Sequence, residues 1–139
     1  MASTAFLITL VVAVAMVTAP ALSTDHWVGD DQGWVLNFDY KAWASTKEFH
    51  VGDTLIFKYK QGAHNVYRAD QRAFQNCTTS SFITPLTSGN DVISLTTPGK
   101  KWYICGIGKH CAKGMKLAIN VLPELGSPAT APSPSGLAS

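Results

Sequence analysis

Charged residues are scarce in this sequence. The 139 residues include 11 Lys and Arg and 9 Asp and Glu, for a formal net charge of +2, and no basic run is longer than Lys100-Lys101. Nucleic-acid recognition needs basic residues concentrated on one face, so the sequence predicts no nucleic-acid partner. No Ser/His/Asp or paired-carboxylate arrangement indicates a hydrolytic enzyme. Since 46% of the residues are hydrophobic, we expect one folded domain flanked by tails.

The longest hydrophobic run lies near the N-terminus and is short for a membrane span. Residues 5–19, AFLITLVVAVAMVTA, are almost entirely apolar, whereas a spanning helix needs about 20 such residues. Ala19-Pro20-Ala21 has the small-x-small form of a signal-peptide cleavage site. We predict a signal peptide over residues 1–23, cleaved after Ala21 or Ser23, and hence a secreted, extracellular protein. An uncleaved membrane anchor is the alternative, because no Lys or Arg precedes the run.

The C-terminal end offers little that could build a core. Residues 125–139 contain only Gly, Ser, Ala, Thr and Pro apart from two Leu, a composition typical of a solvated tail. A GPI signal ends in roughly 10–20 hydrophobic residues, so no lipid anchor is expected. The folded domain is therefore predicted to span residues 24–124, and it contains no internal repeat.

Short runs of alternating hydrophobicity predict β-strands along this domain. In residues 54–60, Leu55, Phe57 and Tyr59 alternate with polar positions, as in a half-buried strand. The same period recurs in residues 115–121. Further β-rich runs cover residues 26–30, 64–69, 91–97 and 101–105.

Turn signals separate these runs, for example Gly52-Asp53 and Pro98-Gly99. Two short helical turns are predicted at residues 38–44 and 70–76. Many short strands at this spacing favour a small all-β sandwich or barrel.

Cysteine is rare in the chain, and the number of cysteines is odd. Cys77, Cys105 and Cys111 are the three that occur. Extracellular thiols normally pair, so one cysteine must pair with another chain, stay free or bind a metal. Two of the three lie in the stretch WYICGIGKHCAKGM, residues 102–115, together with His110 and Met115.

This stretch has the spacing of a metal site. Its ligand-type residues follow the pattern Cys-x4-His-x4-Met, and another histidine lies upstream at the start of the run 64–69. A thiolate, two imidazoles and a weak axial thioether form the ligand set of a blue copper centre. We therefore predict one type 1 copper ion bound by His64, Cys105, His110 and Met115. Two alternatives are that Met115 only fills the core, and that Cys105, Cys111 and two histidines bind structural zinc.

These motifs resemble the phytocyanin family, the plant blue copper proteins with a cupredoxin fold. The similar segments are WVGDDQGW (27–34), FHVGDTLIFKY (49–59), HNV (64–66) and WYICGIGKHCAKGMKLAINV (102–121). The chain is similar to the Met-ligated uclacyanin and plantacyanin types, since stellacyanins have Gln as the axial ligand. The resemblance implies a Greek-key β-sandwich or barrel of the cupredoxin type with one or two short helices.

The resemblance also implies roles for individual residues. It implies copper bound by the four residues named above, with His110 at the exposed edge as the electron port. It further implies a disulfide between Cys77 and Cys111, which leaves Cys105 as the unpaired thiolate. A phytocyanin is expected outside the cell, in the apoplast or cell wall.

Four polar residues near these motifs carry further expectations. Asn65 is expected to bridge the His64 segment to the Cys105 loop by hydrogen bonds, although it could equally be an ordinary turn residue. Asn76-Cys77-Thr78 is a sequon, so Asn76 is a candidate N-glycosylation site. His26 and His50 have no partner at ligand spacing, so surface or packing roles are expected for both.

The predicted function is that of a secreted one-electron carrier that cycles between Cu(II) and Cu(I). We expect a monomer without stable membrane insertion, which exchanges electrons with a protein or small-molecule partner. A copper oxidase is disfavoured, because catalytic metals keep an open position and four protein ligands close this one. The alternative is an extracellular cell-wall or recognition module in which copper is secondary.

Overall fold

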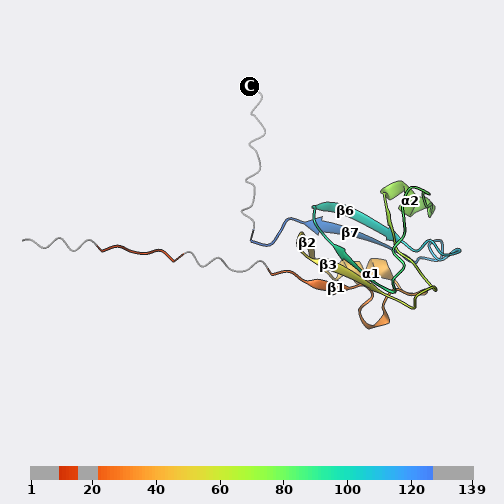
Figure 1. Cartoon of the computed structure of the whole chain (residues 1–139), viewed down its shortest axis with the longest axis horizontal. Coiled ribbons are helices and arrows are strands. Elements are labelled where there is room, and N and C mark those ends of the chain that lie inside the picture. Colours follow the sequence, from red (N-terminus) through yellow and green to blue (C-terminus); the bar gives the residue numbers. More distant parts are fainter. Residues whose placement is uncertain (1–9, 16–21, 127–139) are drawn as a thin grey trace, which may run out of the picture.

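The computed structural model of the chain describes residues 10–15 and 22–126 (Figure 1). The predicted signal peptide and tail fall largely on residues 1–9, 16–21 and 127–139, which lie outside the described residues, so these boundaries stay predictions. Within the described part, no helix has the length and apolar character that a membrane crossing requires.

Within the described residues seven strands form two sheets, which confirms the predicted all-β class. One sheet has the order β1-β3-β5, with β1 at Asp25–Trp27, β3 at Thr54–Lys58 and β5 at Asn90–Ser94. The other has the order β2-β7-β6-β4, with β2 at Phe49–His50, β7 at Lys116–Leu122, β6 at Gly99–Ile104 and β4 at Tyr67–Ala69. Strands β1 and β3 pair in parallel, as do β2 and β7, and the other pairs are antiparallel.

The alternating patterns form strands where they were predicted. In β7, Leu117, Ile119 and Val121 are buried and the residues between them are more exposed. In β3, the central strand of its sheet, Leu55 and Phe57 are fully buried because they face the core. Alternation places one row of side chains on the inner face of each sheet, and these rows meet in the core.

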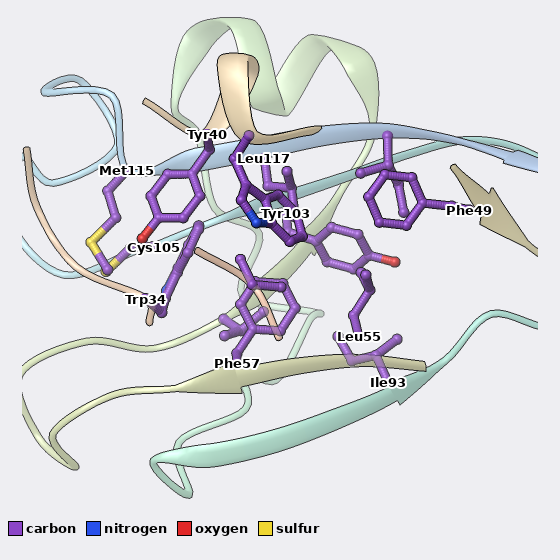
Figure 2. Close-up of a cluster of buried hydrophobic side chains, with 14 of the residues drawn as sticks. Trp34, Tyr40, Phe49, Leu55, Phe57, Ile93, Tyr103, Cys105, Met115 and Leu117 are labelled. Atoms are coloured by element: carbon purple, nitrogen blue, oxygen red, sulfur yellow. The ribbon is translucent and has the colours of Figure 1, made fainter. Parts of the chain in front are cut away.

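An aromatic cluster fills the space between the sheets (Figure 2). The Trp34 and Phe57 rings pack edge to face with their centroids 5.0 Å apart, and the Trp34 indole donates a hydrogen bond to the backbone oxygen of Asn65 over 3.0 Å. Figure 2 shows Cys105 and Met115 at one end of this cluster and Phe49 at the other. The metal-ligand types therefore lie where the aromatic core ends.

Two short helices form where helical turns were predicted. Helix α1 (Tyr40–Ser45) begins after Asp39 and helix α2 (Gln71–Asn76) after Asp70, and in each case the carboxylate accepts the third backbone N–H that follows. A 3-10 helix, η1 (Asp30–Gln32), precedes them.

Two strand predictions were partly wrong and one strand was missed. The run predicted at residues 26–30 extends too far, because β1 ends at Trp27 and Asp30 begins η1. Residues 64–69 were expected to form a single strand, but β4 begins only at Tyr67, and His64 lies in the preceding turn, bridged to Gln61. Strand β2 was missed because its two residues, Phe49 and His50, are too few to display an alternating pattern.

Candidate metal centre

The sheet pairing brings the predicted copper ligands to one end of the second sheet. Cys105 directly follows β6, and Met115 directly precedes β7. Ile104 of β6 pairs with Lys116 of β7 on one side and with Tyr67 of β4 on the other. The turn that precedes β4, with His64, therefore lies beside both ligand-bearing strand ends.

Three of the four predicted ligands converge on one point. The Cys105 sulfur lies 3.5 Å from Nδ1 of His110 and 3.9 Å from Nδ1 of His64. The two Nδ1 atoms are 3.1 Å apart. Among the described residues this is the one cluster of three His, Cys, Asp or Glu side chains placed to hold a metal ion. Cys105 is fully buried, whereas both histidines are partly exposed.

These distances fit a single metal ion. As in zinc sites, sulfur and nitrogen ligands lie roughly 2.0–2.3 Å from the ion, so two ligands of one ion are at most about 4.6 Å apart. All three measured separations, 3.1, 3.5 and 3.9 Å, lie below that limit. A thiolate with two imidazoles is also the donor set that copper takes in its trigonal form. The residues present therefore fit a copper ion.

Met115 is the fourth predicted ligand and lies at the same end of the sheet. Its backbone oxygen accepts a hydrogen bond from the Cys105 N–H over 3.1 Å, and its N–H donates to the His110 oxygen over 3.0 Å. The side chain is buried, and Figure 2 shows Met115 at the same end of the core as Cys105. The four predicted residues are thus positioned as a His-Cys-Met copper site.

Asn65 connects the two halves of this site, as expected from the sequence. Its side-chain oxygen accepts a hydrogen bond from the Gly106 N–H over 2.6 Å. Gly106 itself has no room for a side chain, because a Cβ there would collide with the Tyr67 ring. The backbone of the Cys105 loop can therefore approach the His64 segment closely.

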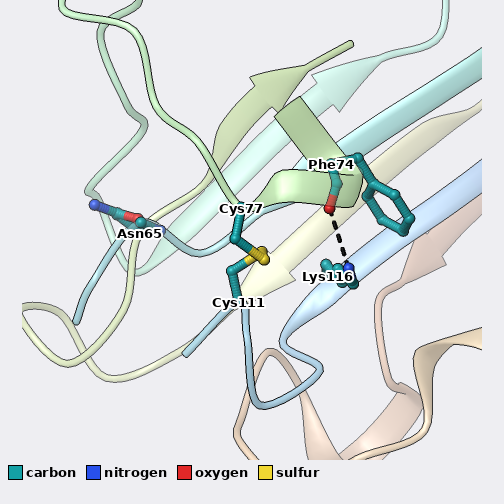
Figure 3. The surroundings of a disulfide bond; sticks show 6 residues. Asn65, Phe74, Cys77, Cys111 and Lys116 are labelled. Carbon is teal, nitrogen blue, oxygen red and sulfur yellow. Dashed lines mark hydrogen bonds between the residues drawn. A yellow bond between two sulfur atoms is a disulfide. The ribbon is translucent and has the colours of Figure 1, made fainter. Parts of the chain in front are cut away.

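The predicted disulfide between Cys77 and Cys111 is present (Figure 3). It joins residues 34 apart in sequence, and the Cα atoms are 5.7 Å apart. Cys77 lies at the end of α2, and Cys111 directly follows His110. The bridge therefore ties the loop that carries His110 to α2.

The site favours neutral imidazole at His64. Burial lowers the pKa of His64, and the nearby charge of His110 lowers it further. A metal ligand must present an unprotonated nitrogen, so this environment suits metal binding.

Tyr59 and Asp91 lie beside the site and were not recognised as a pair from the sequence. The buried Tyr59 hydroxyl donates a hydrogen bond to the Asp91 carboxylate, and its ring packs near His64 with centroids 6.3 Å apart. Burial, followed by this hydrogen bond, raises the pKa of Tyr59 to about 12. One feature of the sequence could have indicated this pair. The carboxylate of Asp91 shares the alternating face of its strand with the apolar Ile93.

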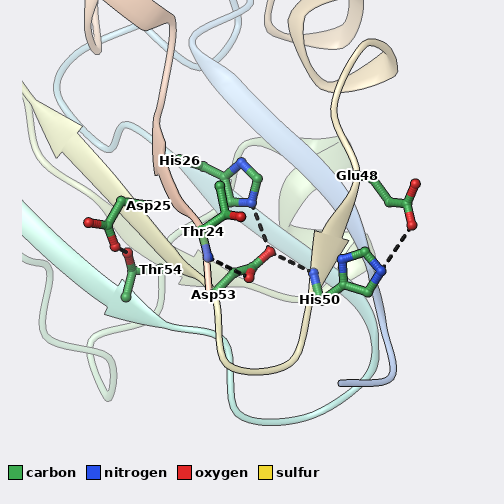
Figure 4. Close-up of polar contacts among 7 residues, drawn as sticks. All are labelled: Thr24, Asp25, His26, Glu48, His50, Asp53 and Thr54. Carbon is green, nitrogen blue, oxygen red and sulfur yellow. Dashed lines mark hydrogen bonds and ion pairs between the residues drawn. The ribbon is translucent and has the colours of Figure 1, made fainter. Parts of the chain in front are cut away.

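His26 and His50 lie in a separate buried polar cluster (Figure 4). His26 Nε2 lies 2.9 Å from the Asp53 carboxylate, which also accepts the backbone N–H groups of Thr24 and His50. The His50 ring pairs with Glu48 over 2.9 Å. The cluster belongs to the Phe49 end of the core, since the His26 and Phe49 rings are 4.6 Å apart, and neither histidine lies near the copper ligands.

Comparison with known proteins gives consistent matches. A Plastocyanin-like domain matches residues 34–115. The chain is 52% identical to a Blue copper protein of Petunia hybrida over 120 residues, covering 84% of this chain but only 45% of that relative. It is 46% identical to Blue copper protein 1a of Medicago truncatula, covering 97% of this chain and 84% of the relative.

Two solved structures have a similar fold. Cucumber stellacyanin with Cu2+ superposes with a TM-score of 0.67 at 38% identity, covering 73% of this chain and 96% of that one. Cucumber basic protein, a blue copper protein, superposes with a TM-score of 0.65 at 38% identity, covering 70% and 99%.

Proposed function

The chain belongs to the phytocyanin family of plant blue copper proteins, and from this membership we propose that it is an extracellular one-electron carrier. The observation that carries the proposal is the convergence of the Cys105 sulfur and the His64 and His110 Nδ1 atoms within 3.1–3.9 Å. When bound, a type 1 copper ion supplies a couple between Cu(II) and Cu(I).

The protein's contribution is to hold the four ligand side chains in one arrangement. Hydrogen bonds from Cys105 to Met115 and from Gly106 to Asn65 fix the thiolate loop from both sides. The disulfide between Cys77 and Cys111 restrains His110, because Cys111 directly follows it in the chain. Because the ligands are held by the fold, little rearrangement accompanies a change of valence, which favours fast electron transfer.

We propose His110 as the electron port. Both histidine ligands are partly exposed while Cys105 and Met115 are buried, and in the phytocyanin family the histidine that corresponds to His110 lies at the exposed edge. The partner is a protein or a small molecule, and Lys109 and Lys113, both exposed on the same loop, would favour an acidic surface.

The remaining predictions about this chain follow from family membership and exposure. We expect a monomer in the apoplast or cell wall that carries electrons and catalyses no reaction. Asn76, exposed at the end of α2, is a candidate for N-glycosylation. The four-ligand set supports a carrier over an oxidase, because it leaves no open position for substrate.

Spectroscopy of the copper-loaded protein tests the proposal. We expect an intense visible thiolate-to-Cu(II) absorption and the electron-paramagnetic-resonance signal of a type 1 site. The colour should bleach on reduction and return on oxidation without loss of metal. A colourless copper complex, or preferential retention of zinc, would contradict the assignment. Oxygen consumption with turnover by the reduced protein would instead indicate an oxidase.

A further inference from the structure

A groove of about 1020 Å³ lies on the second sheet, and none of the four copper ligands lines it. Its walls come from both helices, through residues such as Ala44 of α1 and Phe74 of α2, and its floor from β6 and β7. The lining is mostly apolar, as in sites for small organic molecules.

The floor of the groove presents an aromatic ring beside a small residue. Trp102 of β6 pairs in register with Ala118 of β7, and both line the groove. Directly paired residues point to the same face of a sheet, so the indole lies beside a methyl group. Trp102 is partly exposed, whereas its neighbour Tyr103 points into the core. This leaves room beside the indole for a flat ring.

The two carboxylates that line the groove are already engaged. Asp39 caps α1 by accepting the Ala42 N–H over 2.9 Å. Glu48 pairs with the His50 ring over 2.9 Å. Both carboxylates keep their negative charge, but neither lies within ion-pair distance of Lys41, Lys100 or Lys116.

Four lysines line the groove, and three of them have no acidic partner. Lys47 pairs with Asp30 over 3.2 Å. Within the part of the chain that the structure describes, no carboxylate lies within ion-pair distance of Lys41, Lys100 or Lys116. The groove thus combines an apolar floor with four lysines against two carboxylates, a net positive lining that is complementary to an amphipathic anion.

Lys116 is held in place at the α2 wall. Its ammonium donates a hydrogen bond to the Phe74 backbone oxygen over 3.0 Å and lies 4.6 Å from the centre of the Phe74 ring (Figure 3). An ammonium has three N–H donors, so two remain for a ligand. Because the charge is already positioned, less side-chain entropy is lost on binding.

We propose that this groove binds a small aromatic carboxylate. The ring lies against Trp102 beside Ala118, and the carboxylate is bound by Lys116, while Lys100, on the other side of the indole, adds positive charge at longer range. An acidic oligosaccharide would satisfy the lysines but would leave the apolar walls without a matching ligand. The inference is independent of electron transfer, because no copper ligand takes part.

Nuclear magnetic resonance of the full copper-loaded protein, kept as diamagnetic Cu(I), tests this site. The probes are 2-naphthoate, its uncharged analogue 2-naphthamide, and trigalacturonate, which carries carboxylates without an aromatic ring. We expect 2-naphthoate to shift the Trp102 indole N–H resonance saturably at millimolar concentrations and to bind at least fivefold more tightly than the amide. Binding should weaken as salt increases.

Substitutions in the groove distinguish it from other surfaces. Lys116→Gln should weaken 2-naphthoate binding about two- to fivefold, the range for one partly exposed ion pair, and Lys100→Gln should weaken it less. Trp102→Ala, followed through the Ala118 amide, should weaken it about three- to tenfold. Trp102→Phe, which retains a ring, should weaken it less. The blue absorption of each variant verifies that the protein is folded.

Matched controls lie outside the groove. Lys60→Gln removes an exposed lysine, and Trp27→Ala removes a Trp that is 48% exposed on β1, so neither should change binding. The proposal is overturned by the absence of a saturable shift, by equal affinity for the acid and the amide, or by equal effects of control and groove variants. Binding of trigalacturonate without 2-naphthoate would replace it with a saccharide site.

Discussion

The side-chain oxygen of Asn65 accepts a hydrogen bond from the backbone N–H of Gly106 over 2.6 Å. Each of these residues directly follows a copper ligand, since Asn65 follows His64 and Gly106 follows Cys105. The bond therefore joins two ligand-bearing segments that are 41 residues apart in the chain.

Asn65→Ala should loosen the site without removing a ligand. The substitution leaves the Gly106 N–H without its partner in a partly buried position, at a cost of about 1–3 kcal/mol in the free energy of unfolding. The blue absorption should shift or broaden, because the Cys105 loop is held less firmly. Chemical denaturation and visible spectra measure the two effects. Asn120→Ala, on the exposed face of β7, is the control and should change neither.

Much of the fold could be predicted because one face of each long strand is buried. The alternation in residues 115–121 matches the burial of Leu117, Ile119 and Val121 in β7. Parallel pairing of β1 with β3 and of β2 with β7 could not be predicted, because partner choice depends on tertiary packing and not on local pattern.

The metal site was predictable because its residue types are chemically specific, while its surroundings were not. Cys105, His110 and Met115 have a distinctive spacing, and the odd number of cysteines directed attention to them. The polar pairs His26–Asp53 and Tyr59–Asp91 join residues 27 and 32 apart, and no local pattern links them. The Trp102 groove likewise exists only once the sheet and helices are assembled.

Cys105→Ser should abolish the blue colour and preserve the fold. The hydroxyl is slightly smaller than the thiol and can hydrogen-bond to the adjacent His64 or His110 rings, so the metal-free protein should lose no more than about 1–2 kcal/mol. Visible absorption and near-UV circular dichroism measure colour and fold separately. A variant that remains blue would show that another group supplies the thiolate-like ligand.

Cys77→Ala should instead damage folding. The disulfide closes a loop of 34 residues, and its loss costs about 3–4 kcal/mol on the chain-entropy account. The unpaired Cys111 should also form intermolecular disulfides, visible on non-reducing gels. The double variant Cys77→Ala/Cys111→Ala separates the effects, because it should lose the same stability in denaturant without forming dimers. Wild-type stability in Cys77→Ala would mean that the bridge is dispensable.

Asp53→Asn should make the free energy of unfolding fall less steeply as the pH is lowered, that is, it should flatten the acid limb of the plot of stability against pH. Burial alone raises the pKa of Asp53, but hydrogen bonds from His26, Thr24 and His50 outweigh it and hold the pKa below the ordinary 3.8. A lowered carboxyl pKa stabilises the folded state above pH 3.8, and this contribution disappears as the pH falls through the lower folded-state pKa.

The acid-limb prediction is tested by denaturation between pH 2 and 7. The wild type should lose stability below about pH 4, whereas Asp53→Asn should start about 1–3 kcal/mol lower at neutral pH and decline less on acidification. Asp31→Asn, at an exposed position in η1, should follow the wild-type curve. Parallel curves for wild type and Asp53→Asn would place the acid sensitivity elsewhere.

The substitution Met115→Gln tests whether Met115 is a copper ligand or only a core residue. Burying an amide where a thioether packs should cost the metal-free protein about 1–3 kcal/mol whichever role Met115 has. If its sulfur is the axial ligand, the harder amide oxygen should favour Cu(II), so the reduction potential should fall while the blue absorption persists. Met115→Leu retains apolar packing without a donor atom, and its potential should not fall. Redox titration of the three copper-loaded proteins decides the question, because an unchanged potential in Met115→Gln would reduce Met115 to core packing.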